Sequence, residues 1–202
     1  MPSRRSARSP QRAPRRAKAA RVSSTWTVQL ASPRETARIG TVLASLVRGG
    51  EILALDGELG AGKTYLVRSL AHALGAPVDS IASPTFVLIH EYRGRVPLAH
   101  VDLYRLERPD ELDQLGWSDY LDGRWVVAAE WAERAGAQMP EDRLVLSLSH
   151  RTRTSRMLRC TACGPIAQQL LDGLRRAYRP KAPRPTPAAT RRQTRRTRKP
   201  SR

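Results

Sequence analysis

The segment Gly57–Thr64 reads G-E-L-G-A-G-K-T and matches the phosphate-binding loop pattern G-x-x-x-x-G-K-[ST] at every fixed position. It follows the apolar run 51–56, which predicts a buried parallel strand, and it precedes residues 65–74, whose apolar spacing is helical. In such a strand–loop–helix unit, glycines let successive backbone N–H groups converge on a phosphate, and the helix N-terminus adds partial positive charge. The stretch therefore predicts an α/β domain that binds a nucleoside triphosphate.

Each position of this loop is a candidate contact for the phosphates of ATP. The eight residues are Gly57, Glu58, Leu59, Gly60, Ala61, Gly62, Lys63 and Thr64. Lys63 is expected to reach the β- and γ-phosphates as a point charge, and the hydroxyl of Thr64 to be one ligand of a bridging Mg²⁺. The alternative is a glycine-rich turn with an exposed lysine, but a turn does not need Lys-Thr at the start of a helix.

The net charge of +18 is concentrated at the two ends of the chain. Residues 1–22 hold 8 Arg and Lys and no acid, and residues 175–202 hold 12 and no acid. Of the 36 basic residues 16 then remain, against 18 acids, so residues 23–174 carry a net charge of −2. Both ends have almost no large apolar side chains, which predicts disordered tails at 1–22 and 179–202 around a P-loop ATPase domain at 23–178. The tails either attract phosphate backbones, possible tRNA contact included, or are solvated extensions, and composition leaves both interpretations open.

Other compositional features indicate a protein of the cytoplasm. No run of about 18 apolar residues is long enough to span a membrane, and no apolar stretch follows the basic N-terminus, so we expect a soluble protein without a membrane partner. Cys160 and Cys163 cannot complete a tetrahedral zinc site by themselves, and His150 would add at most a third ligand. Two thiols at the end of a strand are therefore favoured over a metal or redox site.

The order of predicted elements gives the fold class. We expect strands at 25–30, 51–56, 85–92, 96–102, 125–129, 143–150 and 155–161, and helices at 33–47, 65–74, 107–113 and 165–178. The helix at 33–47 should begin with a capping box, Ser32-Pro-Arg-Glu35. The fold class is α/β: a P-loop NTPase-like three-layer sandwich with a mixed, mainly parallel central sheet and a C-terminal antiparallel hairpin.

Two acidic residues are candidates for holding Mg²⁺ beside the loop. Asp102 and Glu130 each end an apolar strand, where crevices form in open α/β sheets, although an acid in this position is often a turn residue or a helix cap. Thr85, in Ser83-Pro84-Thr85, lies where phosphate-sensing switch segments occur, but a Ser-Pro turn explains it equally well. Trp131 follows Glu130 and is either a core residue or a reporter of the site.

Taken together, the motifs resemble one family, the TsaE (YjeE-like) ATPases, which take part in forming threonylcarbamoyladenosine at position 37 of tRNA. The resemblance rests on G-E-L-G-A-G-K-T at 57–64, S-P-T-F at 83–86, H-V-D-L-Y-R at 100–105, P-D-E-L-D-Q-L-G-W-S-D-Y at 109–120 and E-W at 130–131. It extends from about residue 32 to residue 156 and leaves out the tails.

The resemblance implies roles for single residues. It implies that Thr64 and Glu130 are the Mg²⁺ ligands, and that Asp102 belongs to the catalytic centre with Lys63 and positions water or contacts Mg²⁺ through water. Thr85 matches the switch threonine of the family. Ser32 and Arg156 fall near the adenine side, where the alignment also allows Arg151, Arg153 or Arg159 in place of Arg156.

The resemblance also implies partners and a mode of action. ATP binding and slow, partner-stimulated hydrolysis would regulate or reset the TsaB–TsaD complex, without transfer of the threonylcarbamoyl group by this chain itself. The tRNAs concerned are those that read codons starting with A. Two other classes remain as alternatives: a small-molecule P-loop kinase, for which the acidic segment 105–122 is short as a lid, and a nucleotide-sensing RNA-binding protein that acts through its basic tails.

Overall fold

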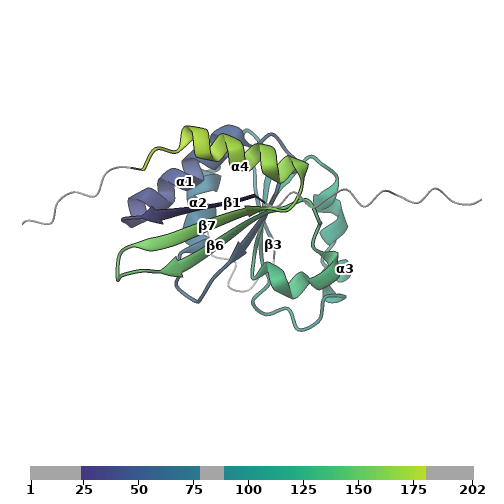
Figure 1. Ribbon diagram of the computed structural model, residues 1–202. Coiled ribbons are helices and arrows are strands. Elements are labelled where there is room, and N and C mark those ends of the chain that lie inside the picture. The colour runs from purple at the N-terminus through teal and green to yellow at the C-terminus, as the bar shows by residue number, and fades with distance from the viewer. Residues whose placement is uncertain (1–23, 78–88, 181–202) are drawn as a thin grey trace, which may run out of the picture.

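In the computed structural model, residues 24–77 and 89–180 are described, and they form a seven-stranded sheet with helices on both faces (Figure 1). The elements are β1 Ser24–Leu30, α1 Pro33–Leu46, β2 Ile52–Asp56, α2 Lys63–Ala73, β3 Ile89–Tyr92, β4 Leu98–Asp102, α3 Glu111–Gln114, η2 Trp117–Leu121, β5 Val126–Glu130, η3 Ala132–Gln138, β6 Leu144–His150, β7 Arg156–Ala162 and α4 Pro165–Ala177. The two 3₁₀ segments, η2 and η3, were not expected from the sequence.

The sheet combines a parallel centre with antiparallel edges. Its strand order is β1-β7-β6-β2-β5-β4-β3. The four strands β6, β2, β5 and β4 are parallel neighbours, whereas β1 pairs with β7, β7 with β6 and β3 with β4 in antiparallel fashion. The predicted α/β fold class is confirmed, including the mixed sheet and the late β6–β7 hairpin.

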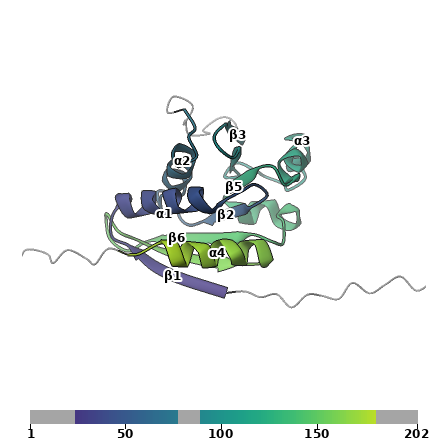
Figure 2. The same cartoon turned by 90° about the horizontal axis from the view of Figure 1, so that it is seen from above.

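Alternating side chains of the strands feed two separate cores. In β2, Leu53 and Leu55 join the core under α1, α2 and α4, whereas Ile52 and Ala54 join the core under α3, η2 and η3. This alternation follows from the two-residue period of a strand, and burial on both faces explains why the central strands read as continuous apolar runs. The result is three layers, with α1 lying between α2 and α4 on one side of the sheet (Figure 2).

The start of α1 differs in detail from the prediction. Pro33 occupies the first turn as expected, but the side chain of Ser32 makes no capping hydrogen bond. Glu35 instead accepts hydrogen bonds from Arg38 at 3.0 Å and from the hydroxyl of Tyr178 at 2.5 Å. The expected capping box is therefore wrong, because Tyr178, which follows α4, brings a buried donor to the glutamate.

The helix expected at 107–113 is shorter and begins later. It spans Glu111–Gln114, preceded by turns, and the backbone N–H of Arg108 donates to the Glu111 carboxylate at 3.2 Å. Arg108 precedes Pro109, and the residue before a proline disfavours the α conformation. This local restriction explains why the helix cannot start at Glu107.

Several other expectations can be placed on the described residues. Within them, no helix is long and apolar enough to cross a membrane. Cys160 is buried on β7 and Cys163 follows that strand, both as free thiols, and burial raises the pKa of Cys160 to about 12. The predicted tail at 1–22, the predicted tail at 179–202 from residue 181 onward, and the strand expected at 85–92 up to residue 88 lie outside the described ranges.

Candidate nucleotide site

The phosphate loop connects the carboxyl end of β2 to the first residue of α2. At its start Gly57 has φ 134°, and a Cβ there would lie 2.2 Å from the carbonyl oxygen of Leu148. At its end Gly62 caps α2 with φ 104°, again in the left-handed region that favours glycine. The fixed glycines of the motif are thus required by a close backbone approach at one end and by the backbone conformation at the other.

Lys63 is held against the loop from which it projects. Its Nζ donates to the carbonyl oxygens of Gly57 at 2.6 Å and Glu58 at 3.2 Å. The same nitrogen lies 3.8 Å from the centre of the Trp131 ring, and the residue is 4% exposed. Burial lowers the pKa of Lys63, and the surrounding carboxylates, with Glu130 first, act in the opposite direction. The ammonium group therefore lies in the loop, where an anion can replace the carbonyl oxygens as its partner.

Glu130 links the loop to the neighbouring strand. The hydroxyl of Thr64 donates to one carboxylate oxygen of Glu130 at 3.0 Å. The Nε2 atom of His100 lies 2.8 Å from the other oxygen, and both side chains are almost completely buried. The two residues expected to hold Mg²⁺, Thr64 and Glu130, are therefore in direct contact, and His100 holds the other carboxylate oxygen of Glu130 in place.

His100 was missed by the sequence analysis as a functional residue, although its motif was quoted. It lies on β4 two residues before Asp102, so both side chains leave the same face of the sheet. His100 pairs in register with Ala128, and Asp102 pairs with Glu130. This spacing, a histidine two positions before a strand-end acid, was the available signal.

Asp102 lies beside this network at the end of β4. It is half-buried, and its Oδ1 accepts a hydrogen bond from the backbone N–H of Tyr104 at 3.0 Å. Burial raises the pKa of Asp102, and the Tyr104 hydrogen bond lowers it. Because Asp102 and Glu130 are register partners on parallel strands, the structure brings the two acidic candidates together.

Trp131 is both a packing residue and part of the site. It has φ 57°, the only left-handed non-glycine residue among those described. Its backbone N–H donates to Leu55 at 3.0 Å, and its ring packs 5.2 Å from that of Tyr104 as well as against Lys63. Trp131 therefore packs against Tyr104 as a core residue does, and it also contacts Lys63 in the candidate site.

Arg156 lies against the loop from the β6–β7 hairpin. Its Nε donates to the carbonyl oxygen of Ala61 at 2.9 Å. Ser32, at the N-terminus of α1, is two residues beyond Leu30, which pairs with Arg156. Of the alternatives to Arg156, Arg151 and Arg153 belong to the exposed turn and Arg159 to the exposed face of β7. Thr85 lies outside the described residues.

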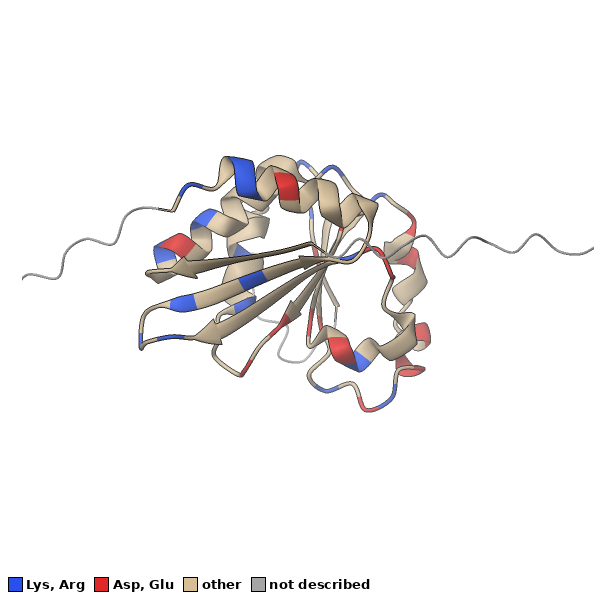
Figure 3. Ribbon diagram, viewed as in Figure 1, with Lys and Arg blue, Asp and Glu red and all other residues tan. Residues whose placement is uncertain are grey.

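The charges of the described part of the chain are distributed unevenly. Figure 3 shows acidic residues around α3 and the turns beside it, whereas basic residues lie on β7 and the β6–β7 turn. The acidic group also contains basic residues, such as Arg124, which forms an ion pair with Asp122. The phosphate loop lies between these two regions in the fold, since β2 is the neighbour of both β6 and β5.

A glycine loop at a helix N-terminus, a lysine in that loop and an acid on the adjacent parallel strand define the class of P-loop nucleotide-binding proteins. Residues 30–158 match the sequence model of the family described as "Threonylcarbamoyl adenosine biosynthesis protein TsaE". The chain belongs to the TsaE family.

Individual relatives agree with this assignment. The chain is 37% identical over 146 residues to the tRNA threonylcarbamoyladenosine biosynthesis protein TsaE of Bacillus subtilis, covering 72% of this chain and 90% of the relative. It is 40% identical over 117 residues to the TsaE protein of Treponema pallidum, covering 58% and 86%. The crystal structure of Bacillus subtilis YdiB matches with a TM-score of 0.65 at 31% identity, covering 78% of this chain and 98% of that one.

Proposed function

We propose that this chain is a Mg²⁺-dependent ATPase required for threonylcarbamoyladenosine formation at position 37 of tRNAs that read codons starting with A. The observation that carries the proposal is the contact of Thr64, the residue directly after the buried Lys63, with Glu130 at 3.0 Å. Family membership supports the tRNA pathway, and this role assigns the protein to the cytoplasm.

Binding of ATP is assigned to the loop and to Lys63. The backbone N–H groups of the loop and the start of α2 bind the phosphates, and Lys63 exchanges the carbonyl oxygens of Gly57 and Glu58 for phosphate oxygens. This exchange is favourable for the Lys63 ammonium group, because its hydrogen bonds to charged phosphate oxygens are stronger than those to neutral carbonyl oxygens. Ser32 and Arg156 are assigned to the adenine side.

Thr64 and Glu130 would hold the Mg²⁺ ion. Both supply oxygen ligands, which Mg²⁺ prefers, and the second oxygen of Glu130 is already fixed by His100. Bound Mg²⁺ would neutralise charge that develops on the phosphate oxygens. Asp102, half-buried beside Glu130, is assigned to positioning the attacking water, and Thr85 to sensing the terminal phosphate.

The hydrolysis cycle is proposed to act on the TsaB–TsaD complex. This chain does not transfer the threonylcarbamoyl group, but one of its nucleotide states binds the partners more tightly than the other, and hydrolysis resets the complex. No arginine is assigned to transition-state stabilisation, and charge supplied by a partner changes rates by about 10³ or more in related hydrolases. We therefore expect slow intrinsic turnover that the partners stimulate. Equal ATPase rates with and without TsaB and TsaD would contradict this.

The domain boundaries remain those proposed from the sequence, with an ATPase domain at 23–178 and basic tails on either side. A role of the tails in tRNA contact is tested by deleting residues 1–22 and 180–202. Loss of function in cells with ATPase activity intact would favour the RNA-binding alternative.

The test of the proposed function is the threonylcarbamoyladenosine content of total tRNA, measured by nucleoside mass spectrometry. Cells depleted of this protein receive the wild type, Lys63→Ala, or Arg159→Gln as a matched control on an exposed part of β7. We expect the modification to be lost on depletion and restored by the wild type and the control only. Undiminished modification after depletion would overturn the proposal.

A second experiment separates metal binding from nucleotide binding. Glu130→Gln keeps the shape of the side chain but removes its charge, so the Mg²⁺ concentration needed for half-maximal ATPase activity should rise more than the dissociation constant of ATP without metal. An equal change in both quantities would argue against Glu130 as a metal ligand.

A further inference from the structure

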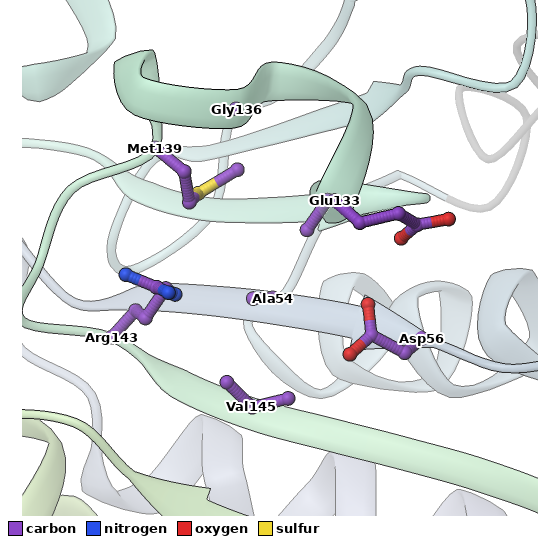
Figure 4. A pocket seen from close by; sticks show the side chains of 8 residues that line it. Ala54, Asp56, Glu133, Gly136, Met139, Arg143 and Val145 are labelled. Carbon is purple, nitrogen blue, oxygen red and sulfur yellow. The ribbon is translucent and has the colours of Figure 1, made fainter.

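A cavity of about 270 Å³ lies on the face of the sheet opposite α2. Its floor is formed by Ala54 of β2 and Val145 of β6, and η3 lies above it, with Met139 pointing down into the space (Figure 4). The remaining lining residues are Asp56, Ala132, Glu133, Gly136 and Arg143. Small side chains on the floor and in η3 leave the space open.

The two ends of this cavity carry opposite charge. The Arg143 side chain enters from one end, and the carboxyl groups of Asp56 and Glu133 lie at the other (Figure 4). Arg143 donates through Nη1 to the carbonyl oxygen of Pro140 at 2.7 Å, and within the described residues it forms no ion pair. The guanidinium and the carboxyl groups thus face the same space without contacting each other.

The two carboxyl groups at one end of the cavity repel each other when both are ionised. The carboxyl groups of Asp56 and Glu133 lie at the same end of the cavity (Figure 4), and their interaction disfavours the charged form of Asp56. Burial first, and then Glu133, raises the pKa of Asp56 to about 6. A cationic donor between the two groups would favour ionisation of both, because its positive charge offsets the repulsion between the two carboxylates.

The cavity is separate from the phosphate loop. None of the residues 57–64 lines it. Ala54 belongs to the core under η3, whereas its neighbours Leu53 and Leu55 belong to the core under α2, so Asp56 leaves the sheet on the η3 side. The cavity and α2 are therefore on opposite faces of β2, although the charge of Lys63 still acts on Asp56 and opposes the rise of its pKa.

From this arrangement we propose that the cavity binds a small zwitterion of the amino-acid class, with its carboxylate on Arg143, its ammonium group between Asp56 and Glu133, and its apolar part against Met139 and Val145. A guanidinium binds a carboxylate through paired hydrogen bonds, and two carboxylates suit an ammonium group with three donors. The inference does not depend on the proposed ATPase function, because it concerns a different face of the sheet.

The test uses the full chain and ligand-observed saturation-transfer NMR. The probe is L-valine, compared with 3-methylbutyrate, which lacks the ammonium group, and with isobutylamine, which lacks the carboxylate. We expect L-valine to bind with a dissociation constant on the order of 1 mM and each half-charged analogue at least about tenfold more weakly, since a hydrogen-bonded charge is lost in each. Equal binding of all three probes, or no binding of L-valine at about 10 mM, would overturn the proposal.

Variants locate the binding. Arg143→Gln and Glu133→Gln each remove one charge and should weaken L-valine binding at least about tenfold, whereas Arg159→Gln, an exposed arginine of β7 outside the cavity, should leave it unchanged. Val145→Phe places a larger side chain on the floor of the cavity, at a partly exposed position of β6, and should abolish L-valine binding. This variant tests the site even where Arg143→Gln does not fold. Binding that survives in Val145→Phe would place the ligand elsewhere and overturn the proposal.

Discussion

The parallel half of the sheet differs from the antiparallel half in how it is covered. Every residue of β5 is buried, because helices or 3₁₀ segments lie on both of its faces. In β1, by contrast, buried and exposed residues alternate, since only the face towards α1 and α4 is covered. The residues proposed to bind ATP phosphates and Mg²⁺ are concentrated in the covered half, so the proposed chemistry is assigned to the strands that are buried on both faces.

The register of the covered half explains this location. Leu55, one residue before the end of β2, pairs with Glu130, which in turn pairs with Asp102. The carboxyl ends of three parallel strands therefore meet at one edge, next to the loop that follows β2. In antiparallel pairs, the carboxyl end of one strand lies beside the amino end of its neighbour, so three adjacent strands cannot bring their carboxyl ends to one edge of the sheet.

The largest expected effect concerns the loop of the covered half. Lys63→Ala removes the only side-chain cation of the loop, and ATP affinity should fall about a hundredfold, the cost of charge-assisted hydrogen bonds of about 1.5 to 3 kcal/mol. Isothermal titration calorimetry measures this, with Arg159→Gln of the antiparallel half as control. Similar losses of ATP affinity in the two variants would contradict the assignment of phosphate binding to the covered half of the sheet.

The same substitution should affect stability differently in β5, inside the covered half, and in β6, which joins the parallel strands to the antiparallel β7. Val127 of β5 is fully buried, whereas Val145 of β6 lies on the same face of the sheet and is partly exposed. Val127→Ala should lower the free energy of unfolding by about 2 kcal/mol and Val145→Ala by less than about 1 kcal/mol, because less apolar surface and a smaller void are involved. Urea denaturation of both variants decides this, and equal losses would contradict the comparison.

A smaller effect is expected at His100, which contacts Glu130 of the proposed metal site. His100→Gln keeps a donor near Glu130 but changes its position, so the Mg²⁺ affinity should fall about tenfold, the lower end of the range for residues that orient a ligand. The affinity of the protein for ATP without Mg²⁺ serves as the control and should stay unchanged. A purely structural role would change both affinities together with the midpoint of thermal unfolding.

The smallest effect is a pH dependence at the end of β2. The pKa of Asp56 is raised to about 6, so its contribution to stability is complete below the unfolded pKa and is lost as pH rises through about 6. Asp56→Asn cannot ionise, and its free energy of unfolding relative to the wild type should therefore increase by about 1 kcal/mol between pH 4 and pH 7, after allowance for solvent screening. Urea denaturation at the two pH values measures this, and a constant difference would contradict it.

Much of the fold was predictable because its signals are local. The motif at 57–64 and the apolar runs of β2 and β5 fix element types over a few residues, and so does Gly94, which lies in the short connection 93–95 between two of the predicted strands. The expected capping box at Ser32 failed because Glu35 bonds Tyr178, a residue 143 positions away. A contact over that separation leaves no pattern in the sequence near either residue.

For the candidate site, the sequence predicted several of the residues but not the contacts between their side chains. Thr64, Glu130 and Asp102 were all named from motif and strand-end position, and the structure brings them together. The contact of His100 with Glu130 and that of Lys63 with Trp131 depend on register and on side-chain direction. Those two properties are set when strands pair and cores fill.

The sequence by itself determined that this chain has a phosphate loop between a buried strand and a helix. Glycines at this spacing let backbone N–H groups converge on a phosphate, and a simple turn does not need Lys63 and Thr64 at the start of a helix. Only the tertiary structure decided which acid meets the loop and which residues surround the second cavity. Arg143 and Asp56 are 87 positions apart in the chain and face one space only because β6 pairs with β2 and η3 covers them both.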